Sequence, residues 1–302
     1  MKNKQFPNFL IVGAAKCGTT ALDGYLKQHP EVFLPEVKEC RYFSNVEENN
    51  KNPYTNKDHV EFISNSNEYY DLYKGVNTPI AGDISPDYLY YYETSIKKIK
   101  KELEENTKII ILIRNPVQRA FSNYLHILRE GYNSLSFDEI IEKEKDWVKT
   151  GVYYGFYVTS PGFYFKAVKH YIENFSNVKV IIFEEFIKDV NAHLIEICDF
   201  LEINNTFEFE DPAFKNKTGL PKNKVLDSII KNKSPLKGIL KKIIENFIGE
   251  KRLKNKLVRI KESNLKKPVL DDKVRVYLKN LYIEDIKELE SLLEKDLSIW
   301  KK

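Results

Sequence analysis

The 302-residue sequence has few cysteines and lacks both a long hydrophobic run and a Gly/Ser/Pro-rich linker. Its three cysteines are scattered, which excludes a disulfide framework and a zinc site of paired cysteines and favours a reducing compartment. The longest apolar runs, such as residues 109–113, are strand-sized, far below the ~20 residues that cross a bilayer. The basic N-terminus leads into an apolar run without a small-residue cleavage site. We therefore expect an untargeted, cytoplasmic protein without a membrane span.

Aromatic and charged residues are abundant. Hydrophobic residues make up 42% and aromatic residues 13% of the chain, enough for a sizeable core and too many for a disordered protein. The net charge of +4 hides a basic segment, residues 215–267, with 17 Lys and Arg against 4 Asp and Glu. Such a segment is typical of solvated helical faces, although it can also attract polyanions.

Apolar runs and helical patterns alternate along most of the chain. Buried strands are expected at residues 9–13, 108–113 and 178–183, with a weaker strand at residues 76–82. Helices are expected at residues 21–28, 117–129 and 163–175, and further helices at residues 236–248 and 271–297. The alternation predicts an α/β fold with a P-loop-like parallel sheet flanked by helices and a helical C-terminal part. We expect one domain over residues 1–302.

A glycine loop follows the first expected strand. Gly13 and Gly18 have the spacing of a phosphate-binding loop, in which backbone N–H groups and a helix dipole face an anion. The lysine of an ATPase loop directly follows the second glycine, where this sequence has Thr19, whereas the lysine here is Lys16. The Ile-rich strand ends in Arg114, not in a carboxylate that could hold Mg²⁺. The loop therefore indicates an anionic nucleotide bound without a metal.

Several motifs resemble the sulfotransferases that use 3′-phosphoadenosine 5′-phosphosulfate (PAPS). Their 5′-phosphosulfate loop is similar to Lys16-Cys17-Gly18-Thr19-Thr20-Ala21, and their 3′-phosphate motif to the segment from Arg114 to Ser122. The branch containing heparan sulfate N- and 3-O-sulfotransferases has motifs similar to Lys38-Glu39-Cys40-Arg41-Tyr42-Phe43, to Gly82-Asp83-Ile84-Ser85-Pro86-Asp87-Tyr88, and to the terminal Asp296-Leu297-Ser298 with Trp300. The resemblance spans most of the chain. Because relatives in the Golgi carry a membrane anchor and no such segment is seen here, we expect an unanchored, bacterial-type or otherwise cytosolic member.

The resemblance also implies how PAPS is held. Lys16 would neutralise the leaving 5′-phosphate, which the loop through Cys17, Gly18, Thr19, Thr20 and Ala21 would bind. Arg114 and Ser122 would bind the 3′-phosphate. Lys217 and Lys222 align with a loop that closes over the nucleotide, and the alternative for this segment is a plain surface loop. Arg119 is either structural or a further neighbour of the phosphate.

For the acceptor side, the resemblance implies that Glu39 is the general base, while the alternative is a surface glutamate in a charged loop. Lys38, Arg41 and Asp83 are candidate acceptor contacts. Arg41 and Ser44 stand where some members of the branch have His and Asp, so those members' acceptor contacts are not assumed. Asp83 replaces the branch's usual Glu, and it either lines the acceptor cleft or forms structural hydrogen bonds.

The sequence thus predicts an enzyme that moves a sulfuryl group from PAPS to a hydroxyl or amine, leaving adenosine 3′,5′-bisphosphate. We expect the acceptor to be a glycan or glycolipid. Two alternatives remain: a metal-dependent nucleotide kinase or NTPase, and a polyanion-binding module that uses the basic segment. No histidine pair has metal-ligand spacing, so no metal is expected, and no nucleic-acid motif is present.

Overall fold

The structure is a computed structural model that describes residues 7–55, 57–132, 135–212 and 268–301, together with the short strands β6 (Leu220–Pro221) and β7 (Leu265–Lys266). Most of the basic segment lies outside the described residues. The same holds for Lys217, for Lys222 and for the helix expected at residues 236–248.

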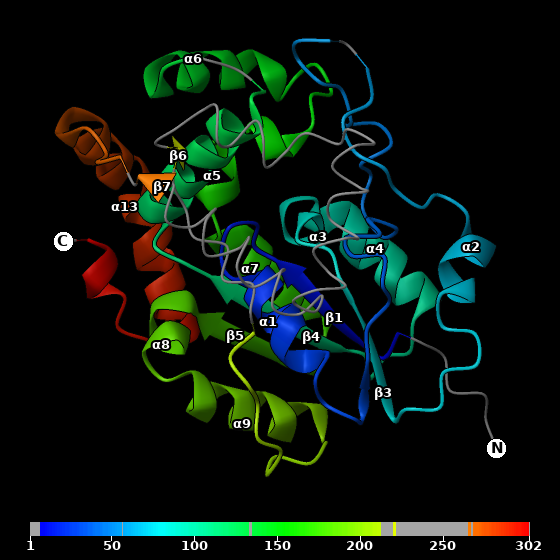
Figure 1. The fold of residues 1–302 in the computed structure, drawn as a ribbon. Helices are drawn as coiled ribbons and strands as arrows, with labels where there is room; N and C mark the ends of the chain where they lie inside the picture. The colour runs from blue at the N-terminus through cyan, green and yellow to red at the C-terminus, as the bar shows by residue number, and fades with distance from the viewer. Residues whose placement is uncertain are drawn as a thin grey trace, which may run out of the picture.

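A five-stranded parallel sheet forms the centre of the fold and confirms the expected α/β class (Figure 1). Its strands, in spatial order, are β2 (Val32–Phe33), β3 (Ile80–Ile84), β1 (Phe9–Gly13), β4 (Lys108–Ile113) and β5 (Val178–Ile182). Every residue of β1 is buried, and so is every residue of β4 after Lys108. This burial on both faces explains why these strands read as continuous apolar runs.

Helices cover both faces of the sheet. The helices are α1 (Thr19–Leu26), α2 (Ser66–Asp71), α3 (Asp87–Tyr90), α4 (Tyr92–Glu102), α5 (Pro116–Glu130), α6 (Phe137–Trp147), α7 (Phe165–Asn174), α8 (Phe183–Lys188), α9 (Val190–Leu201) and α13 (Asp272–Leu293). On one face, α7 packs against α3, α4 and α13, while α8 packs against α9 and, through Phe186, against Tyr25 of α1. Figure 1 shows the strands between α1 and α7.

The strand expected at residues 76–82 is shifted in the structure. Val76 lies in a turn, where its N–H donates to the Tyr73 carbonyl oxygen, and β3 begins only at Ile80. Pro79 has no N–H to offer to a strand ladder, which favours a start after this residue. The strand then continues to Ile84, two residues beyond the expected end.

The C-terminal part is tied to the sheet layer by buried polar contacts. Asp285 of α13 accepts hydrogen bonds from the N–H groups of Tyr164 and Phe165 at the start of α7. Trp300 is 1% exposed and donates through Nε1 to Glu184 at 3.2 Å. The other Glu184 oxygen accepts from the N–H of Asn115 at 3.1 Å, so the chain terminus is connected to the end of β4.

Within the described ranges, no helix combines the length and the apolar composition needed to cross a membrane. The cytoplasmic location stays a prediction.

Candidate active site

The phosphate-type loop joins β1 to α1, as expected from the glycine spacing. Gly18 is the N-cap of α1 with φ 97°, and its carbonyl oxygen accepts from the N–H groups of Ala21 and Leu22. Gly18 has no side chain to cap this helix end, and the first N–H groups of a helix lack partners within the helix, so they are available to an anion at the loop. A Cβ at Gly18 would lie 2.9 Å from the ring of Phe183. Glycine is therefore required here both for its backbone conformation and for space.

Lys16 is half-buried in this loop and adopts a left-handed backbone conformation with φ 70°. Burial lowers the pKa of Lys16 to about 8. The charges of Arg129 and Arg119 on α5 act in the same direction, whereas the carboxylate of Glu39 opposes the shift. Burial and the two arginines together outweigh the carboxylates of Glu39 and Glu130, so the charged form of Lys16 is disfavoured in the free protein. An anionic ligand at the loop would oppose this effect.

Arg114 follows β4 and reaches the same loop. Its Nη1 donates to the carbonyl oxygen of Lys16 at 3.4 Å, although the two residues are 98 positions apart. The guanidinium lies over the ring of Phe183, 4.9 Å from its centroid. The Arg114 Nε is buried without a hydrogen-bond partner among the described residues. Because an unpaired buried donor on a cation is costly, this arrangement suits an anion that accepts from it.

Helix α5 begins immediately after Arg114. Asn115 is its N-cap and accepts hydrogen bonds from the N–H groups of Val117 and Gln118, while Pro116 occupies the first helical position. Ser122 lies two turns along this helix with an exposed fraction of 4%. The backbone of β6 packs beside α5. The expected 3′-phosphate residues are therefore placed on one rigid strand-to-helix unit.

Other polar residues of α5 hold the segment that precedes α7. Arg119 is 1% exposed, and its Nη2 donates to the Val158 carbonyl oxygen at 2.6 Å. Asn123 donates to the carbonyl oxygens of Gly155 and Tyr157. Glu144 of α6 accepts from the N–H groups of residues 158–160. Of the two roles considered for Arg119, the structural one is thus favoured by its position.

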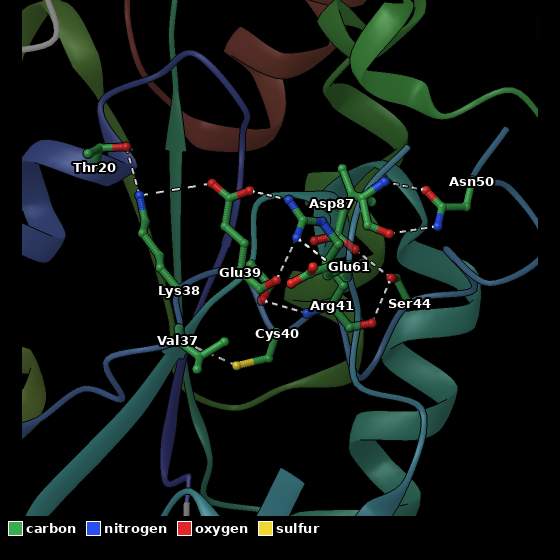
Figure 2. A network of polar contacts seen from close by, with 12 residues as sticks. Thr20, Val37, Lys38, Glu39, Cys40, Arg41, Ser44, Asn50, Glu61 and Asp87 are labelled. Atoms are coloured by element: carbon green, nitrogen blue, oxygen red, sulfur yellow. Dashed lines mark hydrogen bonds and ion pairs between the residues drawn. The ribbon is translucent and has the colours of Figure 1, made fainter. Parts of the chain in front are cut away.

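The loop that carries Glu39 lies against the phosphate-type loop, as Figure 2 shows. Lys38 Nζ donates to Thr20 Oγ1 at 2.7 Å and lies 4.0 Å from Glu39 Oε1. Arg41 Nη2 donates to Glu39 Oε2 at 2.5 Å, and Nη1 donates to the Glu39 carbonyl oxygen. The Glu39 side chain is 34% exposed. Its carboxylate is therefore held between two cations and still reaches solvent.

Backbone strain is concentrated at the same place. In the described part of the chain, five non-glycine residues have positive φ, and three of them are Lys16, Glu39 and Arg41. Such conformations cost energy and persist where the surrounding structure enforces them, which is common at functional sites. The strain therefore supports the assignment of this region as the active site.

Asp83 lies in the core and not beside Glu39. It is 2% exposed, and its oxygens accept from the hydroxyls of Tyr69, Ser85 and Tyr88. Burial raises the pKa of Asp83, while these hydroxyls oppose the shift. This position favours the structural role that the sequence had left open over contact with an acceptor.

Three features near the site were missed in the sequence. Arg129 has the largest charge effect on Lys16, and Tyr153 lies under the Arg41 guanidinium at 5.9 Å. Asp87 is buried and bonded to Ser44. The motif around Asp87 and the aromatic run near Tyr153 are visible in the sequence. Neither pattern indicates that Asp87 and Tyr153 lie near Arg41 in the folded protein.

A cavity of about 420 Å³ lies beside the start of the loop, at Ala14 and Ala15. Its walls include Tyr90, Tyr154 and Phe163. Tyr90 and Tyr154 are stacked with their ring centroids 5.1 Å apart, which gives the cavity an aromatic wall. Its size and lining are typical of a site for an organic ligand.

The described residues fit a doubly anionic nucleotide. The uncapped start of α1 and the Lys16 ammonium suit one anionic group, and the unpartnered Nε of Arg114 suits a second anion nearby.

Comparison with known proteins agrees with this geometry. The family described as the sulfotransferase domain matches residues 6–238. A sulfotransferase crystal structure from Alicyclobacillus acidocaldarius is similar with a TM-score of 0.76 and 28% identity, covering 99% of this chain and 100% of that one.

Two curated relatives are longer than this chain. The membrane-associated sulfotransferase kil1 of Dictyostelium discoideum is 30% identical over 48% of this chain and 29% of its own length. The human heparan sulfate glucosamine 3-O-sulfotransferase 3B1 is 23% identical over 72% of this chain and 52% of its own length. Matches to these relatives thus cover about half of their length or less. The chain belongs to the sulfotransferase domain family.

Proposed function

We propose that the protein transfers a sulfuryl group from PAPS to a hydroxyl or amine of a carbohydrate acceptor. Membership of the sulfotransferase family argues against the nucleotide kinase and the polyanion-binding module. The observation that carries the proposal is the contact between Arg114 and the backbone of Lys16. It brings a second cation to the phosphate-type loop, and the part of the chain that the structure describes contains no cluster of three or more His, Cys, Asp or Glu side chains that could hold a metal ion.

When bound, PAPS supplies the sulfuryl group and leaves as adenosine 3′,5′-bisphosphate. Lys16 and the start of α1 stabilise the negative charge that develops on the 5′-phosphate as its bond to sulfur breaks. Arg114 and Ser122 bind the 3′-phosphate, with Lys217 and Lys222 as further contacts. The two ends of the nucleotide are thus recognised by different elements, which selects it over nucleotides that lack a 3′-phosphate.

Glu39 accepts the proton of the acceptor hydroxyl while that oxygen forms its bond to sulfur. Two observations support this role: the Glu39 carboxylate is partly exposed to solvent, and it is close enough to Lys16 to affect the pKa of that amine. Lys38 fixes the Glu39 loop to Thr20, and Arg41 orients the carboxylate. Charged groups of this kind suit an acceptor rich in hydroxyl or anionic groups.

Titration calorimetry tests the nucleotide assignment. We expect adenosine 3′,5′-bisphosphate to bind without a metal, and to bind more tightly than adenosine 5′-phosphate or ATP with Mg²⁺. Arg114→Lys should weaken bisphosphate binding by about tenfold and leave adenosine 5′-phosphate binding almost unchanged. The reason is that only the bisphosphate has a 3′-phosphate for the planar guanidinium of Arg114 to bind. Preference for ATP with Mg²⁺ would disprove the proposal.

A transfer assay tests the reaction itself. PAPS labelled in its sulfur is incubated with glycans, glycolipids and phenols, and labelled products are separated. We expect transfer to a carbohydrate and a loss of about 10²-fold or more in turnover for Glu39→Gln, with bisphosphate affinity retained. Glu36→Gln, a nearby exposed glutamate, serves as the matched control and should retain turnover.

A further inference from the structure

Asp87 lies behind the ion pair of Glu39 and Arg41. It is the first residue of α3, and its exposed fraction is 1%. Its Oδ2 forms a short hydrogen bond with Ser44 Oγ, whereas Oδ1 is buried with no hydrogen-bond partner in the part of the chain that the structure describes (Figure 2). Burial disfavours the ionised form of this carboxyl more than the charge of Arg41 and the hydrogen bonds to it favour that form. The surroundings therefore favour a carboxyl group that holds its proton.

The Ser44 hydroxyl gives independent support for this protonation. Its oxygen lies 3.0 Å from the Arg41 carbonyl oxygen and also contacts Asp87 Oδ2. A hydroxyl has one proton, so Ser44 cannot donate to both acceptors. Both contacts are satisfied together when Asp87 donates to Ser44 and Ser44 donates to Arg41. This arrangement of acceptors favours a protonated Asp87.

Both charged and neutral titratable groups of the described residues surround Asp87. The titratable groups around it are Glu39, Cys40, Arg41, Tyr88, Tyr91, Tyr153, Tyr154 and Tyr171. Burial raises the pKa of Cys40 and of each of these tyrosines, so they are neutral near pH 7. Arg41 and Glu39 remain as the charged groups. Burial raises the pKa of Asp87 to about 7, against the opposing charge of Arg41.

We propose that Asp87 is a positioning residue that competes with Glu39 for the positive charge of Arg41. This inference rests on the proposed role of Glu39 as the base. Arg41 has a donor to spare, because its Nε is buried without a partner among the described residues while Nη2 is bonded to Glu39.

The competition depends on where the Asp87 proton is. When Asp87 releases its proton to solvent, Ser44 donates to Asp87, and the new negative charge attracts Arg41. The pair between Arg41 and Glu39 then weakens, which frees the Glu39 carboxylate to accept a hydrogen bond from the acceptor hydroxyl. Glu39 is thus restrained below neutral pH and released above it.

Carbon-13 NMR of protein labelled at the carboxyl carbons of Asp and Glu tests this coupling without an acceptor. The Glu39 signal is assigned with Glu39→Gln, and the Asp87 signal with Asp87→Asn. We expect the Glu39 carboxyl carbon to show an inflection at the pH where Asp87 titrates, near neutrality, and Asp87→Asn to abolish it. A Glu39 carboxyl signal with the same pH dependence near neutrality in the parent protein and in Asp87→Asn would overturn the proposal, as would an Asp87 that titrates below about pH 5.

Two further variants keep the test decisive. Ser44→Ala retains the carboxyls of Glu39 and Asp87 but removes a hydrogen bond that lowers the pKa of Asp87. The inflection in the Glu39 signal should therefore move to higher pH, together with the titration of Asp87. Asp83→Asn changes a buried carboxyl whose oxygens accept from hydroxyls and should leave the inflection in place. An unmoved inflection in Ser44→Ala, or a lost one in Asp83→Asn, would contradict the assignment to Asp87.

Turnover separates this inference from the function on which it rests. With the acceptor found in the transfer assay, Asp87→Asn should lower kcat about tenfold at alkaline pH and change bisphosphate affinity by less than about twofold. Full turnover in Glu39→Gln would refute the role of Glu39 as the base even if the NMR coupling is present. Absence of the coupling with an inactive Glu39→Gln would refute only the role of Asp87.

Discussion

Lys16 combines a positive charge with burial, and its pKa is consequently lowered to about 8. Lys16→Met should reduce kcat by about 10²–10³-fold while bisphosphate affinity falls much less, because the ammonium acts mainly on the charge of the leaving phosphate. Steady-state kinetics and calorimetry measure the two effects. Equal losses in kcat and in affinity would contradict this role.

The same pKa predicts a pH dependence. The protonated amine is the active form, so kcat/KM of the free enzyme should fall as the pH rises above about 8. Lys16→Arg is the matched control, because a guanidinium stays charged throughout this range. Its rate should be lower, since the guanidinium is not a compact point charge, but the alkaline decrease should be absent. An unchanged alkaline limb in Lys16→Arg would assign that limb to another group.

Gly18 lies where the phosphate-type loop packs against Phe183, the first residue of α8, and close to Leu112 of β4. Gly18→Ala places a methyl group 2.9 Å from the Phe183 ring, on which the Arg114 guanidinium also lies, and does so at φ 97°. We expect the free energy of unfolding to fall by about 1–3 kcal/mol and bisphosphate binding to weaken. Gly75→Ala is the control, because it also has positive φ but meets no atom within 4 Å. It should lower stability alone, as measured by urea unfolding.

At the scale of elements, the start of α5 determines where the 3′-phosphate residues lie. Asn115→Ala removes the cap of this helix and should lower the free energy of unfolding by about 1 kcal/mol. Because Arg114 precedes the cap and Ser122 follows it, bisphosphate affinity should also fall. Asn65→Ala removes an equivalent cap from α2 and should reduce stability without changing affinity. Equal affinity in both variants would show that the cap does not position the site.

At the scale of the whole molecule, buried carboxyls make stability depend on pH. The pKa of Asp87 rises to about 7 and that of Asp285 to about 6, both through burial, so the folded protein binds protons that the unfolded chain releases. The stability from such a group is complete below its unfolded pKa and is lost as the pH rises through the folded value. The protein should therefore lose stability between about pH 4 and about pH 7 from these groups.

Asp87→Asn isolates one of these contributions. Relative to the parent protein, its free energy of unfolding should increase with pH across this window, by up to about 1.4 kcal/mol per pH unit. Urea unfolding at several pH values measures the difference in the free energy of unfolding between the two proteins. The contributions of Asp285 and Asp83 cancel in this difference, because both proteins contain them. Parallel curves for the two proteins would show that folding does not raise the pKa of Asp87.

Local patterns in the sequence were sufficient for the elements that build the site. The strand at residues 108–113 has the expected bounds, because a run of isoleucines has few stable alternatives to a buried strand. The loop glycines and the Asn-Pro start of α5 were also visible, since turns and caps depend on neighbouring residues. The start of β3 was misjudged, because the apolar Val76 turned out to lie in a turn.

By itself, the sequence determined the buried strands β1, β4 and β5 to within a residue, where the phosphate-type loop and helix α5 begin, and which motifs carry charge, but it did not indicate the short edge strand β2. Only the tertiary structure decided that Arg114 contacts Lys16, that Asp83 is enclosed by hydroxyls, and that Asp87 lies behind Glu39 and Arg41. The reason is physical: periodicity and capping act over a few residues, whereas the burial and partners of a charge depend on segments that meet only after folding.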